Sequence, residues 1–187
     1  MAKMIDRIER WLLGEAPPPP IAQLIGFRLM AIEPGEAIIE FEAGEAHANP
    51  MGTLHGGVLC DVADAAMSLA FAATLDEGES FTTLELKINF LKPIWKAGLK
   101  ATGRVVKRGR VIGLVECDVA DEGGNLVARA SSACMILRGE PETFSLPKPA
   151  LSALHHTRYP QKYGGLPVSA LPTLAAPLMI ELQSEGC

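Results

Sequence analysis

The stretch from Asn49 to Leu75 constrains the fold more than any other part of the chain. It reads NPMGTLHGGVLCDVADAAMSLAFAATL, a glycine-rich turn followed by a segment in which alanine, leucine and methionine, all good helix formers, predominate. From Val58 to Leu75 the side chains with polar groups are Cys60, Asp61, Asp64, Ser68 and Thr74. A helix that is apolar on nearly every face is normally buried on all sides. We therefore expect this helix at the centre of the domain.

Two carboxylates lie in this apolar helix. Asp61 and Asp64 are three residues apart, which places them on roughly the same face. A buried carboxylate costs free energy unless it is paired, hydrogen-bonded or used in chemistry. The two aspartates are therefore the first candidates for functional residues, and the like charge of Asp61 would raise the pKa of Asp64.

Most of the remaining regular structure is predicted to be strand. Thr83 to Leu91 alternates strictly between apolar and polar residues, as half-buried strands do. Other segments with strand composition and turn residues at their ends are 27–33, 36–43, 99–107, 111–120 and 126–137. Short turns join consecutive strands, which excludes the long crossovers of βαβ units. The order β-β-α-β-β-β-β predicts an α+β fold, with one curved antiparallel sheet wrapped around one long central helix.

The two ends of the chain differ from this central part. Residues 1–20 are interpreted as an amphipathic N-terminal helix followed by a stiff proline linker. Residues 21–140 form the predicted domain. Residues 141–187 are interpreted as a proline-rich C-terminal extension, which holds half of the 14 prolines of the chain. Because proline lacks the donor that a strand ladder needs, we expect this extension to pack against the domain surface.

Composition and charge exclude several classes of protein. The formal net charge of −5 argues against general nucleic-acid binding, which favours basic surfaces. The first residues lack the apolar core of a signal peptide, and the longest apolar run, from Ala65 to Leu75, is shorter than the ~20 residues that a membrane span needs. The four cysteines have no CxxC spacing and are expected to be free thiols, three of them buried. We therefore expect a cytoplasmic protein without a membrane span.

The motif around the start of the central helix resembles the hotdog-fold thioesterases of the phenylacetic-acid-degradation type. The residues that carry the resemblance are Asn49-x-x-Gly52-x-x-His55-Gly56-Gly57, Asp64 and the strand TLELKINFLKP from Thr83 to Pro93. The likeness extends from about Gly26 to Leu137 in the same order, and it includes nothing from residues 1–16 or 139–187. It implies a hotdog fold and an acyl-CoA thioesterase that acts on an aryl- or medium-chain acyl-CoA without metal or cofactor.

The resemblance also implies a role for each residue of the motif. It assigns the Gly56 N–H to the oxyanion of the reaction and Asp64 to the role of nucleophile or general base. It assigns Asn49 and His55 to the positioning of substrate or water. Thr83 would orient the attacking water or Asp64.

Elementary physics supports the glycine end of the helix as an anion site. Gly56 and Gly57 open the helix, so unpaired backbone N–H groups and the positive end of the helix dipole point at one spot. Glycine lets a substrate approach that backbone closely. Such donors suit the oxyanion that develops on a thioester carbonyl.

The spacing of the two groups predicts an assembly. Asp64 lies eight residues beyond Gly56, or ~12 Å along an α-helix axis. An acting base must lie within ~3 Å of its reacting partner. Two antiparallel helices related by a two-fold axis can supply both groups to one carbonyl. We therefore expect a homodimer with two composite sites, which the resemblance also implies, and a dimer of dimers as the larger assembly.

Other residues have two interpretations each. Asp61 stands where the family usually has a small residue, so it is either a residue of the substrate site or a solvated or capping carboxylate. Lys107, Arg108 and Arg110 either contact the phosphates of CoA or belong to a solvated hairpin turn. Thr83 is either a site residue or an ordinary strand threonine.

Two rival functions use the same fold. The first is a non-catalytic acyl-CoA-binding regulatory module, which would need the glycine end but has no need of Asp64. The second is a hotdog dehydratase or hydratase, which needs a histidine paired with an acid at a spacing that this sequence lacks. A metal site is not expected, because the histidines and aspartates near the motif match no metal-ligand spacing. Catalytic thioester hydrolysis is the preferred prediction.

Overall fold

The computed structural model describes residues 3–139 of the 187-residue chain, and the extension expected over residues 141–187 lies outside the described residues. The elements in order are α1 (Met4–Leu12), α2 (Pro20–Ile25), β1 (Arg28–Glu33), β2 (Glu36–Ala43), the 3₁₀ turn η1 (Glu45–His47), α3 (Gly56–Ala72), β3 (Glu79–Phe90), β4 (Ala97–Arg108), β5 (Ile112–Asp121) and β6 (Leu126–Arg138). The predicted succession of strands and central helix is confirmed. Within residues 3–139, no helix has the length and apolar character required to cross a membrane.

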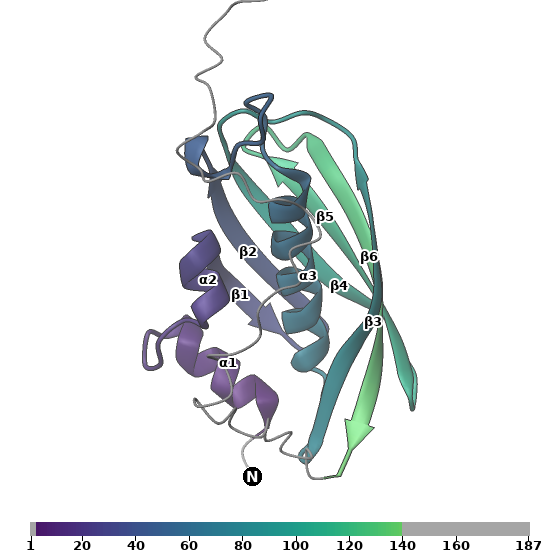
Figure 1. The fold of residues 1–187 in the computed structure, drawn as a ribbon. Helices are drawn as coiled ribbons and strands as arrows, with labels where there is room; N and C mark the ends of the chain where they lie inside the picture. Colours follow the sequence, from purple (N-terminus) through teal and green to yellow (C-terminus); the bar gives the residue numbers. More distant parts are fainter. Residues whose placement is uncertain (1–2, 140–187) are drawn as a thin grey trace, which may run out of the picture. The chain divides into compact units, whose positions relative to one another are not determined.

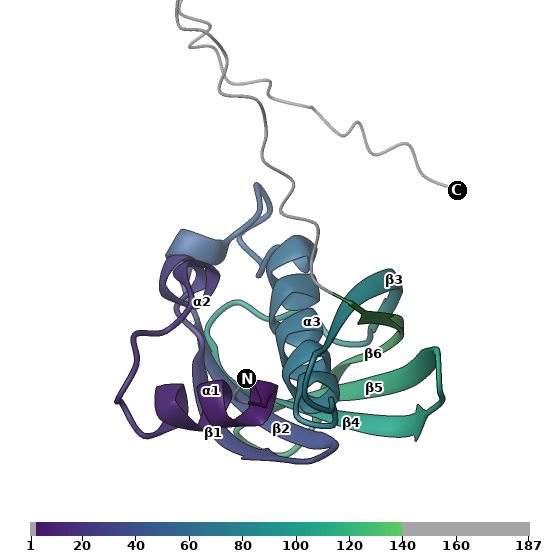
Figure 2. The same ribbon diagram turned by 90° about the horizontal axis from the view of Figure 1, so that it is seen from below.

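The strands of the described region form one antiparallel sheet in the order β1-β2-β4-β5-β6-β3. The sheet curves around α3, which lies along its concave side between β1 and β3 (Figure 2). The N-terminal helices α1 and α2 lie beside α3 on the side of β1 and β2 (Figure 1). This is the α+β hotdog arrangement that the resemblance implied.

Glycine and small side chains let α3 lie directly on the sheet. The fully buried residues of its inner face are Val62, Ala63, Ala66, Met67, Ala70 and Phe71. A Cβ atom at Gly103 of β4 would lie 2.8 Å from the backbone nitrogen of Met67 and closer still to the carbonyl of Ala66. Because these obstacles are backbone atoms, a larger residue at Gly103 would push the helix away from the sheet.

The prediction that α3 is buried on every side was wrong. Asp61 is exposed, and Asp64 and Ser68 are half-buried, so one stripe of the helix faces away from the sheet. Of the four cysteines, three of which were expected to be buried, Cys60 is half-buried, Cys117 and Cys134 are buried, and Cys187 lies outside the described residues. The polar residues recur at helical spacing, which makes α3 amphipathic despite its high alanine content.

The strand β3 forms one edge of the sheet and pairs with β6 on its other side. It begins at Glu79 rather than at Thr83, and a register shift between Thr83 and Glu85 interrupts the strict alternation that the sequence predicted. Leu84 is 50% exposed and Phe90 is 54% exposed. The apolar face of β3 is therefore only partly covered within one protomer.

Candidate active site

The glycine end of α3 presents one unused backbone donor. His55 is the N-cap, and its Nδ1 accepts a hydrogen bond of 2.9 Å from the Gly57 N–H. No acceptor for the Gly56 N–H is found within residues 3–139. The Gly56 N–H is therefore free to donate to a ligand at the positive end of the helix dipole. Because Nδ1 of His55 is an acceptor, a neutral imidazole at this position carries its proton on Nε2.

Hydrogen bonds within the loop before α3 fix the conformation of the chain that leads to the glycine end of the helix. Asn49 Oδ1 accepts hydrogen bonds from the N–H groups of Met51 and Thr53, at 2.9 and 3.3 Å, and Asn49 Nδ2 donates to Thr53 Oγ1 at 2.8 Å. The predicted positioning residue Asn49 thus organises the loop that leads to Gly56. A cavity of about 430 Å³ opens here, lined by Asn49, Gly56, Phe90 and neighbouring residues.

Phe90 is a site residue that the sequence did not identify. Its ring lies over the start of α3, so that a Cβ atom at Gly56 would be 2.9 Å from Phe90 Cζ. The aromatic ring and the free Gly56 N–H therefore share one wall of the cavity. In the sequence, Phe90 was one of several apolar residues in an alternating strand and had no distinguishing signal.

Asp64 lies about two turns farther along the outer stripe of α3. Burial raises the pKa of its carboxyl group, and the negative charge of Asp61 raises it further. Both aspartates line a cavity between α3 and the N-terminal segment. The predicted like-charge effect of Asp61 on Asp64 is therefore confirmed in direction, although Asp61 is the more exposed of the two.

Thr83 belongs to the surroundings of Asp64. It pairs in register with Cys134 of β6. The Thr83 side chain forms a hydrogen bond with the Cys134 thiol, which by itself lowers the pKa of the thiol. Burial raises the pKa of that thiol, and the charge of Asp64 adds to the rise. The Cys134 thiol thus interacts with both Thr83 and Asp64, which places the two predicted site residues in one neighbourhood.

The structure does not bring Gly56 and Asp64 together within one protomer. Both lie on the same straight helix, eight residues apart, which corresponds to ~12 Å along its axis. His55, Gly57 and Asn49 belong to the glycine end, whereas Asp61 and Thr83 belong to the neighbourhood of Asp64. The predicted residues thus form two half-sites.

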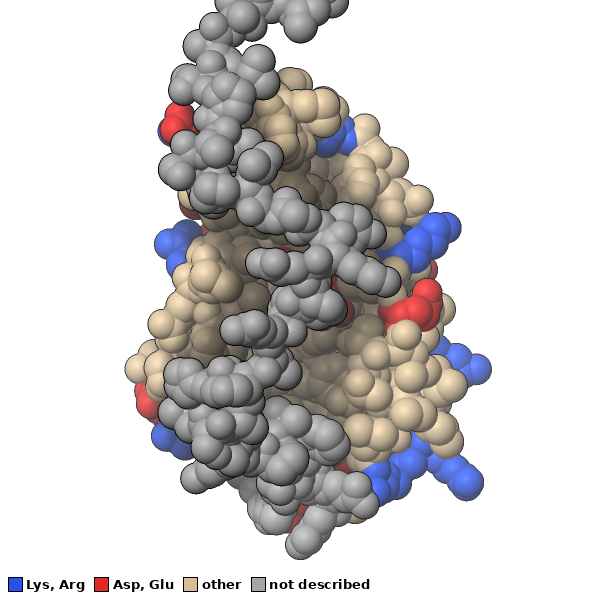
Figure 3. Space-filling view, in the orientation of Figure 1, with Lys and Arg blue, Asp and Glu red and all other residues tan. Residues whose placement is uncertain are grey.

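The predicted phosphate contacts lie elsewhere. Arg108 forms ion pairs with Glu79 and, at 3.6 Å, with Asp76, so its charge is already neutralised within the protomer. Lys107 and Arg110 are exposed on the β4–β5 hairpin. This hairpin lies at the end of α3 opposite to Gly56, because Gly113 contacts Phe71 near the helix C-terminus. On the face that carries α3, most visible Lys and Arg side chains lie at the margins (Figure 3).

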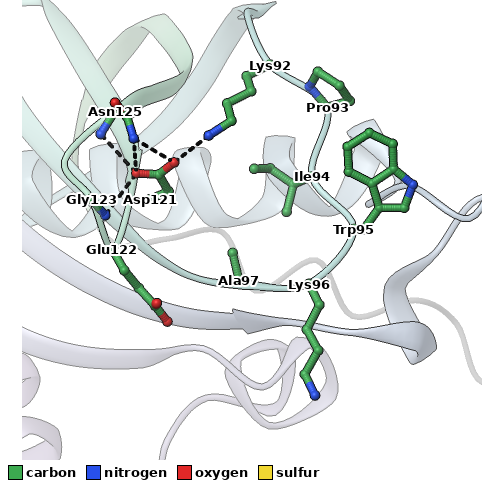
Figure 4. A pocket seen from close by; sticks show the side chains of 10 residues that line it. All are labelled: Lys92, Pro93, Ile94, Trp95, Lys96, Ala97, Asp121, Glu122, Gly123 and Asn125. Atoms are coloured by element: carbon green, nitrogen blue, oxygen red, sulfur yellow. Dashed lines mark hydrogen bonds and ion pairs between the residues drawn. The ribbon is translucent and has the colours of Figure 1, made fainter.

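Another cavity, of about 360 Å³, lies beside the loop after β3 (Figure 4). Its polar centre is Asp121, which accepts hydrogen bonds from Lys92 at 2.6 Å and from the Gly123 N–H at 3.0 Å. These contacts lower the pKa of Asp121 to about 2, and the hydrogen bond from Lys92, which stabilises the charged form, is the largest cause. None of the predicted catalytic residues lines this cavity. Its contacts fix the loop that follows β3.

Comparisons with known proteins point in one direction. The sequence profile of the thioesterase superfamily matches residues 51–128. A Saccharolobus solfataricus protein, provisionally named an esterase, is 33% identical over 118 residues, which are 63% of this chain and 84% of that protein. Human acyl-coenzyme A thioesterase 13 is 29% identical over 104 residues, which are 54% of this chain and 73% of that enzyme. The structure of a phenylacetic acid degradation-related protein from Ralstonia eutropha JMP134 is similar with a TM-score of 0.63 and 34% identity, covering 68% of this chain and 97% of that one.

Proposed function

The chain belongs to the thioesterase superfamily, and we propose that it hydrolyses acyl-CoA thioesters with an aryl or medium-length acyl group to the free acid and CoA. The observation that carries this proposal is the half-buried carboxylate of Asp64 on the outer stripe of α3, with a pKa raised by burial and by Asp61. A carboxylate of raised pKa is a stronger general base than an ordinary aspartate. A module that only binds its ligand gains nothing from such a group.

The proposed reaction uses Asp64 and the free Gly56 N–H together. A water molecule gives one proton to the Asp64 carboxylate while its oxygen bonds to the thioester carbon, and negative charge moves onto the carbonyl oxygen. The Gly56 N–H donates to that oxygen. The C–S bond then breaks, the CoA thiolate takes up the proton held by Asp64, which restores the carboxylate, and the carboxylic acid is released. Direct attack by Asp64, through a mixed anhydride that water cleaves, would use the same two groups.

We assign the two groups of one site to two copies of the chain. Gly56 and Asp64 are ~12 Å apart along the axis of α3, too far for both groups of one helix to contact the same thioester carbonyl. The edge of β3 is unpaired within residues 3–139, and Leu84 and Phe90 of this strand are each about half exposed. A long apolar edge strand is normally covered in a stable protein. Pairing of β3 with its two-fold copy would set two α3 helices antiparallel, each with its glycine end toward the other's Asp64.

A dimer of dimers is the larger assembly that we propose. Side chains on the outer face of the sheet, opposite α3, include several large exposed apolar residues, namely Val106, Ile112, Leu114 and Leu137. Exposed large apolar side chains that gather on one face are typical of subunit contacts. Sedimentation or light scattering of the purified full chain measures which assembly forms.

Release of free thiol from a panel of aryl-, short-, medium- and long-chain acyl-CoA esters tests the proposed activity. We expect turnover of aryl or medium-chain esters, and loss of at least ~10² in kcat in Asp64→Asn, which keeps the shape but removes the base. The matched control is Asp118→Asn, a surface aspartate of β5 that pairs with Arg129. Tight binding of acyl-CoA without thiol release by the wild type would identify a binding module instead.

A further inference from the structure

The N-terminal segment of this chain forms one wall of the cavity at Asp64. The cavity has a volume of about 250 Å³. From the N-terminal side it is lined by Trp11 at the end of α1, by Pro19 and Ile21 around the start of α2, and by Phe27 before β1. From the other side it is lined by Asp64, Leu69 and their neighbours on α3. Asp64 is thus one of the lining groups of a cavity whose N-terminal wall is apolar.

This wall is held firmly against the domain. Ile8 of α1 is 7% exposed and Phe27 is 5% exposed, so the segment is anchored in the core before and after the cavity. Between these anchors, Pro17 to Pro20 stiffen the chain, and α2 ends at Gly26 in the left-handed conformation. Trp11 is half-buried and Ile21 is 48% exposed, and both belong to this anchored segment beside α3.

We propose that this cavity receives the acyl group of the thioester, and that Trp11 and Ile21 set the size of the acyl group that is accepted. The inference rests on the proposed function, because it places the acyl group beside Asp64, the proposed base, which lines the cavity. A group of methylene size needs about the volume of one water molecule, ~30 Å³. A cavity of about 250 Å³ is therefore on the scale of a medium-length chain or of one ring with a short spacer rather than of a long fatty chain.

The proposed specificity wall lies outside the residues that carry the family motif. The family profile begins at residue 51, and the likeness in motif begins near Gly26, whereas Trp11 and Ile21 precede both. Acyl selectivity in this protein thus depends on residues that no catalytic motif includes.

Two substitutions that change the wall in opposite directions test the proposal. Trp11→Ala enlarges the cavity, so the optimum should move to longer acyl groups. For each methylene group newly accommodated, kcat/KM should rise by about fourfold. Ile21→Trp narrows it and should shift the optimum to shorter groups. Leu13→Ala and Leu24→Ala, which remove exposed apolar side chains of the same segment outside the cavity, should leave the preference unchanged.

The outcomes separate this inference from the proposed function. If the wild type hydrolyses acyl-CoA esters and both wall variants alter kcat/KM equally for all acyl lengths, the wall does not select the acyl group and the inference is wrong. Absence of thiol release from every ester by the wild type would instead refute the proposed function itself. Opposite shifts of the preferred acyl length in the two wall variants, with an unchanged preference in the two control variants, would establish that the wall selects the acyl group.

A spectroscopic measurement covers the case in which Trp11→Ala fails to fold. The chain has two tryptophans, so Trp11 is the single emitter in the variant Trp95→Phe. In a Trp95→Phe, Asp64→Asn background, octanoyl-CoA should change the Trp11 emission and CoA by itself should not. In the reciprocal Trp11→Phe, Asp64→Asn protein, octanoyl-CoA and CoA should give the same Trp95 response. Equal Trp11 responses to octanoyl-CoA and CoA would place the acyl group elsewhere.

Discussion

Replacement of Gly103 by alanine links the packing of the fold to the activity of the site. The added Cβ would lie 2.8 Å from Met67 N, where ordinary contact begins at 3.4 Å, and it would meet the Ala66 carbonyl closer still. Because these atoms belong to the backbone of α3, the helix must withdraw by more than half an ångström. Overpacking of this kind costs typically about 1–3 kcal/mol, which lowers the Tm of a chain of this size by roughly 3–9 °C.

The same displacement should impair catalysis, because α3 carries both Gly56 and Asp64. A misplacement of about 1 Å can cost ~10²-fold in rate, so we expect at least a tenfold loss of kcat in Gly103→Ala. The matched control is Gly98→Ala in the same strand, where the new Cβ meets only the flexible end of Glu122. Thermal melts and thiol-release assays of both variants are the measurements. If Gly103→Ala melts and reacts like Gly98→Ala, α3 does not pack on β4 as described.

Two further predictions follow from the charges around Asp64. In Asp61→Asn the loss of the like charge should lower the pKa of Asp64 and move the acid limb of the pH profile of kcat/KM to lower pH. An acid limb at the same pH as in the wild type would contradict the effect of the Asp61 charge on Asp64. Because burial raises the pKa of Asp64, the folded state binds the Asp64 proton more tightly than the unfolded state does. Ionisation of Asp64 therefore lowers the free energy of unfolding as the pH rises above ~3.9, the pKa of an unperturbed aspartate. Asp64→Asn should therefore melt higher than the wild type at pH 7, with the gain vanishing near about pH 3; a lower Tm at pH 7 would refute this.

The sequence predicted the fold well because its periodicities are clear and its turns carry glycine, proline and aspartate. It missed the exposed stripe of α3, since the small side chains around Asp61 and Asp64 conceal the helical spacing of the polar residues. It also missed the early start of β3 at Glu79. The segment before Thr83 has mixed polarity, and it becomes a strand through pairing with β6, which no local pattern reveals.

The glycine end and Asp64 could be proposed from the sequence because their spacing forms a motif along one helix. Trp11 and Ile21 were not found, because their approach to Asp64 depends on where α1 and α2 lie against α3. Arg108 illustrates the same limit. Its pairing with Glu79 depends on the ends of β3 and β4 meeting in space, and it turns a candidate phosphate contact into a structural ion pair.

Mixing two inactive variants tests the composite site most directly. Asp64→Asn removes the base, and Gly56→Pro removes the N–H donor. The backbone before Gly56, the first residue of α3, suits proline, because His55 already has the extended conformation that proline requires, with φ −65° and ψ 131°. The Phe90 ring must shift, because its Cζ lies 2.9 Å from the added Cβ. Gly56→Ala is the matched control, since it adds a Cβ near Phe90 but keeps the N–H.

After subunit exchange in an equal mixture, half of the dimers should be mixed, and each mixed dimer should contain one intact site. We predict recovery of about a quarter of the wild-type thiol-release activity, although each variant is inactive when it is assayed separately. If exchange is demonstrated and the mixture stays inactive, Gly56 and Asp64 do not act together across a subunit boundary.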